Sequence, residues 1–178
     1  MRKEKTIIAI TAAAGLAGIA YALWPKRKVP ADAIVDPFDQ ERYLGVWHEV
    51  ARMPSMIEKD LLDVKDEYSR NPDGTIKVIT RAFNKFKNKP VEATGTMKAR
   101  GSQARGQLKV AYFLPIFLDY NILDIDEHYK FALVSGSGMR YLWLLSRESS
   151  MPEEMKQRFL QKAIALGFDI SQLEWMDY

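Results

Sequence analysis

The sequence predicts an all-β domain of short antiparallel strands, followed by one helix. Three observations predict it. Stretches of alternating or β-prone residues recur at near-regular spacing between about residues 43 and 146, separated by turn residues. No long helical pattern lies between them, whereas a parallel sheet needs helical crossovers. A Pro-Asp-Gly turn joins two of the stretches as a hairpin. By this pattern alone the sheet is a sandwich or a barrel.

Eight stretches have strand character. In chain order they are Tyr43 to Met53, Asp66 to Arg70, Thr75 to Phe83, Val91 to Ala99, Gln107 to Phe113, Leu118 to Ile125, Tyr129 to Val134 and Arg140 to Ser146. Asn71 to Gly74 forms the turn of the hairpin between the second and third, and the glycine-rich run Ser135 to Gly138 joins the last two. We expect consecutive strands to be neighbours in the sheet.

One helix is predicted after the eighth strand. Ser150 is placed to cap it, with Glu153 three residues on as in a capping box. An apolar stripe at helical spacing predicts the face that packs on the sheet, and it comprises Met155, Phe159, Ala163 and Leu166. Gly167 is a natural terminator, and a last short strand is expected from Leu173 to Met176.

The N-terminal region has a different character from the rest. Thr6 to Trp24 contains no charged residue and is long enough to cross a bilayer as a helix. Residues 1–24 are therefore either a signal peptide or a transmembrane anchor, and the interfacial Trp24 with the basic residues after it favours the anchor. Residues 25–36 are expected to be a tether, and residues 37–178 the folded domain.

Composition excludes several kinds of site. The chain has no cysteine, so it has no disulfide, thiolate metal site or cysteine nucleophile, and no residue for a bacterial lipoprotein anchor. Two histidines are too few for most metal centres. The formal net charge of +3 owes much to basic residues that flank the apolar segment, so it does not indicate a nucleic-acid binder. We expect no metal and no cofactor.

Two segments resemble the lipocalin family, in the form of its bacterial and apolipoprotein D-like members. The segment from Tyr43 to Arg52 resembles the Gly-x-Trp motif of the first lipocalin strand. The segment from Tyr141 to Arg147 resembles the end of the eighth lipocalin strand, which closes on an arginine. The block from Leu108 to Asn121 is also similar to the bacterial group, whereas Asp126 to Tyr129 matches the family's Thr-Asp-Tyr motif only loosely. The resemblance implies an eight-stranded antiparallel up-and-down barrel with the C-terminal helix packed outside.

The resemblance also assigns residue roles. Trp47 would plug the closed end of the barrel with Arg147 across its ring, and Gly45 would permit their close approach. From strand alternation in this register, the residues expected to face the pocket are Glu49, Ala51, Met53, Ala132, Val134, Tyr141, Trp143 and Leu145. Glu49 is unusual there, and it either meets a ligand head group or water, or forms a buried bridge to an arginine, lysine or tyrosine.

The implied function is a binding protein that carries or scavenges fatty acids or lysophospholipids in the cell envelope. The apolar loop formed by Phe113, Leu114, Ile116, Phe117 and Leu118 would lie at the open rim, where it could touch a membrane, pair with a second barrel, fold over the ligand or simply tuck onto its own barrel. Alternatives are a lipid-modifying enzyme that uses Glu49 and Tyr141, a haem carrier, and a protein-interaction module without a ligand.

Overall fold

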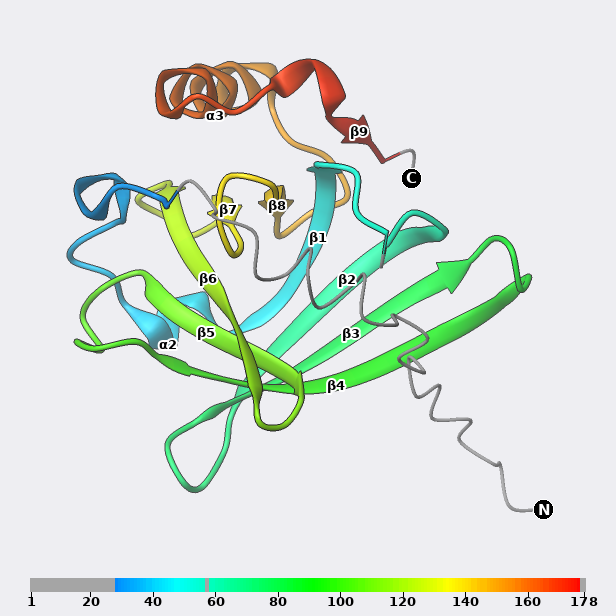
Figure 1. The fold of residues 1–178 in the computed structure, drawn as a ribbon, viewed down its shortest axis with the longest axis horizontal. Coiled ribbons are helices and arrows are strands. Elements are labelled where there is room, and N and C mark those ends of the chain that lie inside the picture. The colour runs from blue at the N-terminus through cyan, green and yellow to red at the C-terminus, as the bar shows by residue number, and fades with distance from the viewer. Residues whose placement is uncertain (1–27, 57, 177–178) are drawn as a thin grey trace.

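The computed structural model describes residues 28–56 and 58–176, and within them it forms a closed antiparallel barrel (Figure 1). The eight barrel strands are β1 (Gly45–Arg52), β2 (Leu61–Arg70), β3 (Ile76–Asn84), β4 (Lys89–Ala99), β5 (Gln107–Phe113), β6 (Ile116–Ile125), β7 (Phe131–Ser135) and β8 (Leu142–Ser146). Each pairs with the next along the chain, and β1 pairs with both β8 and β2, which closes the sheet. The predicted up-and-down barrel is confirmed.

Shorter elements frame the barrel. They are the 3-10 turns η1 (Ala31–Ala33) and η2 (Ile170–Gln172), the helices α2 (Gln40–Tyr43) and α3 (Glu153–Leu166), and the two-residue strand β9 (Glu174–Trp175). Figure 1 shows α3 outside the barrel, alongside β7 and β8. Strand β9 adds to the outer part of β1, where Ala51 pairs with Trp175.

Two hydrophobic cores follow from strand alternation. Inward side chains form a core within the barrel, and its members include Trp47, Ile76, Leu108, Ile122 and Leu145. Outward side chains of β6, β7 and β8 meet the apolar stripe of α3 in a second core, in which Phe159 and Ala163 are fully buried. The predicted stripe is confirmed, because Met155 and Leu166 also pack against this outer core.

The start of α3 differs from the expectation. Its N-cap is Pro152, which has no side-chain cap, so Ser150 does not cap it. The Ser150 carbonyl instead accepts a hydrogen bond of 2.8 Å from the Ser146 hydroxyl, which holds the turn after β8. The end of the helix is as expected, since Gly167 has φ 87° and its N–H bonds back to Ile164.

The predicted Pro-Asp-Gly turn is confirmed between β2 and β3. The Gly74 N–H donates to the Asn71 carbonyl at 3.0 Å, and the Asp73 carboxylate accepts from the Thr75 N–H at 2.9 Å. Strand β2 begins at Leu61, five residues before the predicted Asp66. A register shift near Asp63, whose φ is 49°, interrupts its alternation and hides its first half from a period-two pattern.

The chain before α2 also contacts the barrel. The Val35 N–H donates to the Ile122 carbonyl at 2.9 Å, and the Val35 carbonyl accepts from the Gly106 N–H at 2.9 Å. Ala33 and Ile34 are buried. The predicted anchor or signal peptide at residues 6–24 lies outside the described residues, and among the helices of the described part none is long and apolar enough to cross a membrane.

Candidate functional site: the barrel cavity

The closed end of the barrel is plugged by aromatic side chains. The Arg147 guanidinium lies 3.9 Å from the centre of the Trp47 ring, and it also donates to the carbonyls of Tyr129, Val46 and Arg42. Trp47 donates its indole N–H to the Tyr43 carbonyl at 2.8 Å and stacks on the Tyr43 ring. Gly45 sits beside them with φ 99°, and a Cβ there would lie 3.1 Å from an Arg147 nitrogen. Trp47, Arg147 and Gly45 thus lie together at the closed end, where the sequence analysis expects them.

A cavity of about 370 Å³ occupies the barrel above the plug. Its lining reaches Ser55, Lys87 and Ser137 in the β1–β2, β3–β4 and β7–β8 loops and Leu118 near the start of β6, so its mouth lies at this end of the barrel. One wall, from β3 to β6, is mainly apolar. Its apolar residues are Val78, Ala82, Val91, Ala93, Met97, Val110 and Leu118. This volume and lining suit one small hydrophobic molecule.

The predicted pocket residues divide into three groups. Glu49, Tyr141, Trp143 and Leu145 line the cavity, and their contact with a ligand stays a prediction. Ala132 and Val134 face inward but are packed in the inner core, with no exposed surface, and are not among the lining residues.

The third group, Ala51 and Met53, requires a correction. Both belong to the outer core beneath α3. The register between β1 and β8 shifts after Glu49, so that Glu49 pairs with Leu145 while Ala51 pairs with Leu144. This bulge puts Ala51 on the outside together with Val50, and it turns Arg52 inward, where it meets Glu49. Simple alternation from Trp47 therefore fails beyond Glu49.

Arg52 is the residue that the sequence reasoning missed. Its Nη1 lies 3.0 Å from Glu49 Oε2, and the two side chains are 2% and 3% exposed. Its Nη2 donates to the carbonyls of Glu58 and Leu61, which ties the β1–β2 loop to the wall. The bridge to an arginine, one of the two expectations for Glu49, is present.

The wall formed by β1, β2 and their loop is acidic. Burial, and then the proximity of Glu58 and Asp66, raise the pKa of Glu49 well above its usual range, against the attraction of Arg52. Burial also raises the pKa of Glu58, although Arg52 and side-chain hydrogen bonds with Ser55 and Trp143 oppose it. The pKa of Asp66 is raised to about 6 by burial, with hydrogen bonds from Thr80 and Tyr68 opposing. The cavity thus has one apolar and one acidic wall.

Hydroxyl groups connect the acidic wall to the floor. Asp66 accepts from Thr80 at 2.5 Å and from Tyr68 at 3.4 Å. The Tyr68 hydroxyl is 2.9 Å from that of Tyr120, which is 2.6 Å from that of Tyr43. On the other side, the Thr80 and Tyr112 hydroxyls are 2.7 Å apart. Burial raises the pKa of each of these tyrosines, so they remain protonated.

The rim of the mouth is apolar, as predicted for the β5–β6 loop. Leu114 is 72% and Ile116 67% exposed, and Phe113 and Leu118 are also exposed. Phe86 in the β3–β4 loop, at 83%, and Met56 in the β1–β2 loop, at 91%, add to it. Phe117 differs, because it is half-buried on the barrel exterior between the ammonium groups of Lys98 and Lys109. Alternation along β6 gives Phe117 the opposite face from Ile116 and Leu118.

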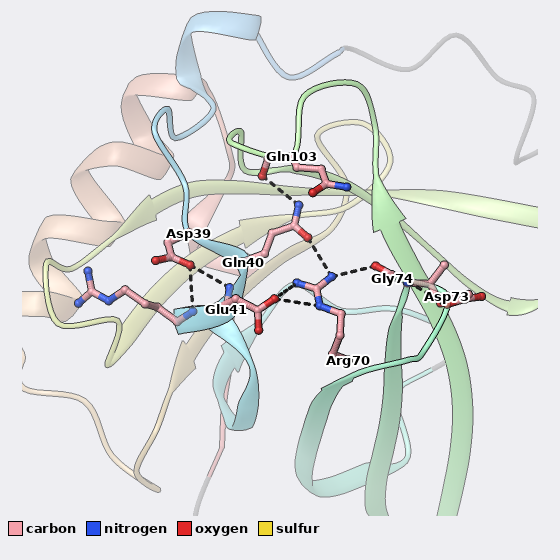
Figure 2. A network of polar contacts seen from close by, with 9 residues as sticks. Asp39, Gln40, Glu41, Arg70, Asp73, Gly74 and Gln103 are labelled. Atoms are coloured by element: carbon pink, nitrogen blue, oxygen red, sulfur yellow. Dashed lines mark hydrogen bonds and ion pairs between the residues drawn. The ribbon is translucent and has the colours of Figure 1, made fainter.

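A second, wider hollow of about 750 Å³ lies at the closed end, around α2. Figure 2 shows that several charged and amide residues of its lining are joined in a network of polar contacts, namely Asp39, Gln40, Glu41, Arg70 and Gln103. Arg70 donates to the Glu41 carboxylate and, at 2.9 Å, to the Gly74 carbonyl. Gln40 donates to the Gln103 carbonyl at 2.9 Å. These contacts attach α2 to the β2–β3 turn, and we assign this hollow a structural role.

Among residues 28–56 and 58–176, no group of three or more histidine, aspartate or glutamate side chains is arranged to hold a metal ion. The cavity lining in this part of the chain contains no histidine, and His48 lies outside it.

Comparisons with known proteins agree with this geometry. Residues 38–178 match the family model described as a lipocalin-like domain. The chain is 35% identical to the outer membrane lipoprotein Blc of Escherichia coli (strain K12) over 170 residues, which are 96% of this chain and 94% of that protein. It is 36% identical to temperature-induced lipocalin-1 of Arabidopsis thaliana, covering 79% of each. The fold is similar to insecticyanin from the tobacco hornworm, with a TM-score of 0.69 and 17% identity over 86% of this chain and 88% of that one.

Proposed function

This chain belongs to the lipocalin family, whose members bind small hydrophobic molecules, and we propose that it carries or scavenges single-chain lipids, fatty acids or lysophospholipids, in the cell envelope. The observation that carries the proposal is the cavity of about 370 Å³, which combines an apolar wall with a mouth open to the rim loops. Each methylene that leaves water contributes about 0.8 kcal/mol, so a long acyl chain can supply micromolar affinity after the costs of association. No catalytic step is proposed for it.

The orientation of the lipid follows from the charges at the mouth. Lys87 lines the cavity there, Lys85 is exposed on the same loop, and Lys89 is exposed at the start of β4. A carboxylate or phosphate head group at the mouth would meet these ammonium groups, and the acyl chain would lie along the apolar wall. The head group stays hydrated in this orientation, which avoids the cost of burying its charge.

The envelope location rests on two supports. Relatives at 35% identity are named outer membrane lipoproteins. This sequence has no cysteine, and its apolar run at residues 6–24 would hold the barrel at a membrane in place of a lipid. If the run is cleaved, the barrel is released into the periplasm or medium.

The exposed rim fits a membrane surface in this proposal. Phe86, Leu114 and Ile116 are exposed at the rim, and Phe86 lies between Lys85 and Lys87 in the sequence, so apolar and cationic groups would meet acyl chains and anionic head groups together. A lipid would then pass between bilayer and cavity without crossing water. Pairing of two rims in a homodimer would hide the same surface, and the mass of the complex distinguishes the two.

Native mass spectrometry of the full chain, released from membranes in polymer-bounded particles without detergent, tests the proposal. We expect one single-chain lipid per barrel, or one per two barrels if the rims pair. An empty barrel that also fails to bind added octadecanoic acid and lysophospholipid would overturn it.

A further inference from the structure

The acidic wall gives the cavity a polar preference that an apolar lining would lack. Three carboxylates, those of Glu49, Glu58 and Asp66, belong to lining residues of this wall. Two other acidic lining residues direct their carboxylates elsewhere, since Glu92 pairs with Arg81 at 3.0 Å and Asp119 with Arg100 at 2.6 Å. The acidic wall therefore carries the carboxylates that a bound acyl chain could meet inside the cavity.

Hydrogen-bond direction can be assigned along the hydroxyl chain. Tyr68 and Thr80 each have one O–H, and each donates it to Asp66. The Tyr120 hydroxyl must then donate to Tyr68, and Tyr112 must donate to Thr80. The Tyr43 hydroxyl in turn donates to Tyr120. All of these protons point toward Asp66, so this series of hydroxyl groups presents acceptor lone pairs to the cavity.

Two further donor side chains next to this wall are also engaged. Arg52 donates to Glu49 and to the carbonyls of Glu58 and Leu61. The Trp143 side chain is hydrogen-bonded to Glu58. An ionised carboxylate offers about four acceptor positions, and Asp66 has two donors among the described residues. It therefore has capacity to accept from a third group that reaches it through the cavity.

We infer that the cavity selects single-chain lipids that carry a hydroxyl group on the acyl chain, away from the head group, and that Asp66 accepts the hydrogen bond from this hydroxyl. The inference rests on the proposed function, because it needs an acyl chain in the cavity with its head at the mouth. Asp66 pairs with Thr80 in the middle of the β2–β3 ladder, well inside the ends of both strands. A hydroxyl near the middle of the chain is therefore at the depth of Asp66, whereas a 2-hydroxyl stays at the mouth.

The inference predicts the sign of a difference in affinity. Burying a hydroxyl without a partner in an apolar cavity weakens binding, by about tenfold. A hydrogen bond to a charged acceptor reverses this, so the hydroxylated lipid binds tighter by about tenfold. The two cases therefore differ in direction, and the sign of the affinity difference tells them apart.

The titratable groups around the cavity make the preference depend on pH. Besides Glu49, Glu58 and Asp66, those on the lining are Glu92, Asp119, Tyr68, Tyr112, Tyr120, Tyr141 and, at the mouth, Lys87, and Arg52 lies against Glu49. At pH 8 the Asp66 carboxyl is ionised and can only accept. Below pH 6 it holds a proton and donates in turn, so the preference for a hydroxylated chain becomes smaller.

The test compares octadecanoic acid with 10- and 12-hydroxyoctadecanoic acid, all with the same head group and chain length. The full chain is held in lipid nanodiscs at pH 8, with empty nanodiscs as the partition control, and each acid displaces N-phenyl-1-naphthylamine. We expect at least one hydroxy acid to bind about tenfold tighter than octadecanoic acid. In Asp66→Asn the ratio of the affinity for the hydroxy acid to that for octadecanoic acid should fall toward one. Glu67→Gln, which also replaces a carboxyl group by an amide but on the outer face of β2, should leave this ratio unaltered.

Three results separate the possibilities. Tighter binding of a hydroxy acid that depends on Asp66 supports the inference. Weaker binding of both hydroxy acids than of octadecanoic acid overturns it and leaves the proposed carrier function intact. If none of the three acids displaces the probe, the proposed function itself fails.

Discussion

Arg52 and Glu49 form an ion pair inside the barrel wall, with 3.0 Å between Nη1 and Oε2 and both side chains almost fully buried. The bulge after Glu49 makes this pair, because it brings to one face two residues that are three apart in a strand. Arg52 then fastens the β1–β2 loop, whose Ser55 and Glu58 line the cavity. The bulge in β1 thus positions the residues on one side of the candidate site.

Replacement of Arg52 by methionine should destabilise the protein by about 3–5 kcal/mol, because it leaves Glu49 buried beside two other carboxyl groups without its cation. The double variant Arg52→Met with Glu49→Leu should recover a large part of that loss. Urea unfolding at pH 7.5 measures both. A double variant as unstable as the single one would contradict the assignment of the penalty to an uncompensated charge.

Gly45→Ala should destabilise the closed end by about 1–2 kcal/mol. An added Cβ would lie 3.1 Å from Arg147 Nη1, and the φ of 99° is strained for any L side chain. Ligand affinity should change little, because the plug is separate from the cavity lining. Thermal unfolding and the probe displacement assay test the two parts, and an unchanged melting temperature would show that the plug tolerates the methyl group.

Trp143→Ala and Met53→Ala should affect different properties, the first ligand affinity and the second stability. Trp143 lines the cavity, so its loss should weaken binding of octadecanoic acid by about tenfold or more while the barrel stays folded. Met53 lies in the outer core beneath α3, so its loss should cost about 2–4 kcal/mol of stability and leave affinity unaltered. Equal effects of both variants on affinity would argue against this placement of the β1 bulge.

Asp66 should make stability depend on pH. Its pKa rises from 3.8 to about 6 in the folded protein, so the folded state holds the proton more tightly than the unfolded chain. The contribution of Asp66 to the free energy of unfolding is therefore greatest below pH 4, and this contribution is lost as pH rises through 6. Asp66→Asn removes this dependence, so it should stabilise the protein relative to wild type by about 1–3 kcal/mol more at pH 8 than at pH 4. A difference that does not change between pH 4 and 8 would rule out an elevated pKa.

The strand pattern and the two motif segments were sufficient to predict the barrel, the outer helix and the Trp47–Arg147 plug. These features depend on local periodicity and on short motifs, which a single sequence displays. The inward position of Glu49, Tyr141, Trp143 and Leu145 followed from alternation measured from the plug, and alternation holds there because β8 has no bulge between Leu142 and Ser146.

The remaining site residues depend on features that have no local pattern. The bulge after Glu49 reverses the faces of Ala51, Arg52 and Met53, and nothing in the Val50-Ala51-Arg52 segment marks it. Asp66 was assigned to a strand but not to the cavity, because the shift near Asp63 obscures which face of β2 is inside. Glu58 lies in a loop whose path is set by Arg52. The acidic wall is thus a product of tertiary structure.

The most direct test of the central claim, that an acyl chain occupies the barrel cavity, is quenching of tryptophan fluorescence by 9,10-dibromooctadecanoic acid in the full chain, compared between wild type and Trp143→Phe. The account predicts saturable quenching at one lipid per barrel in wild type, and loss of most of that quenching in the variant with little change in affinity by probe displacement. Quenching that does not saturate, or that is the same in Trp143→Phe, would place the lipid outside the cavity and contradict the account.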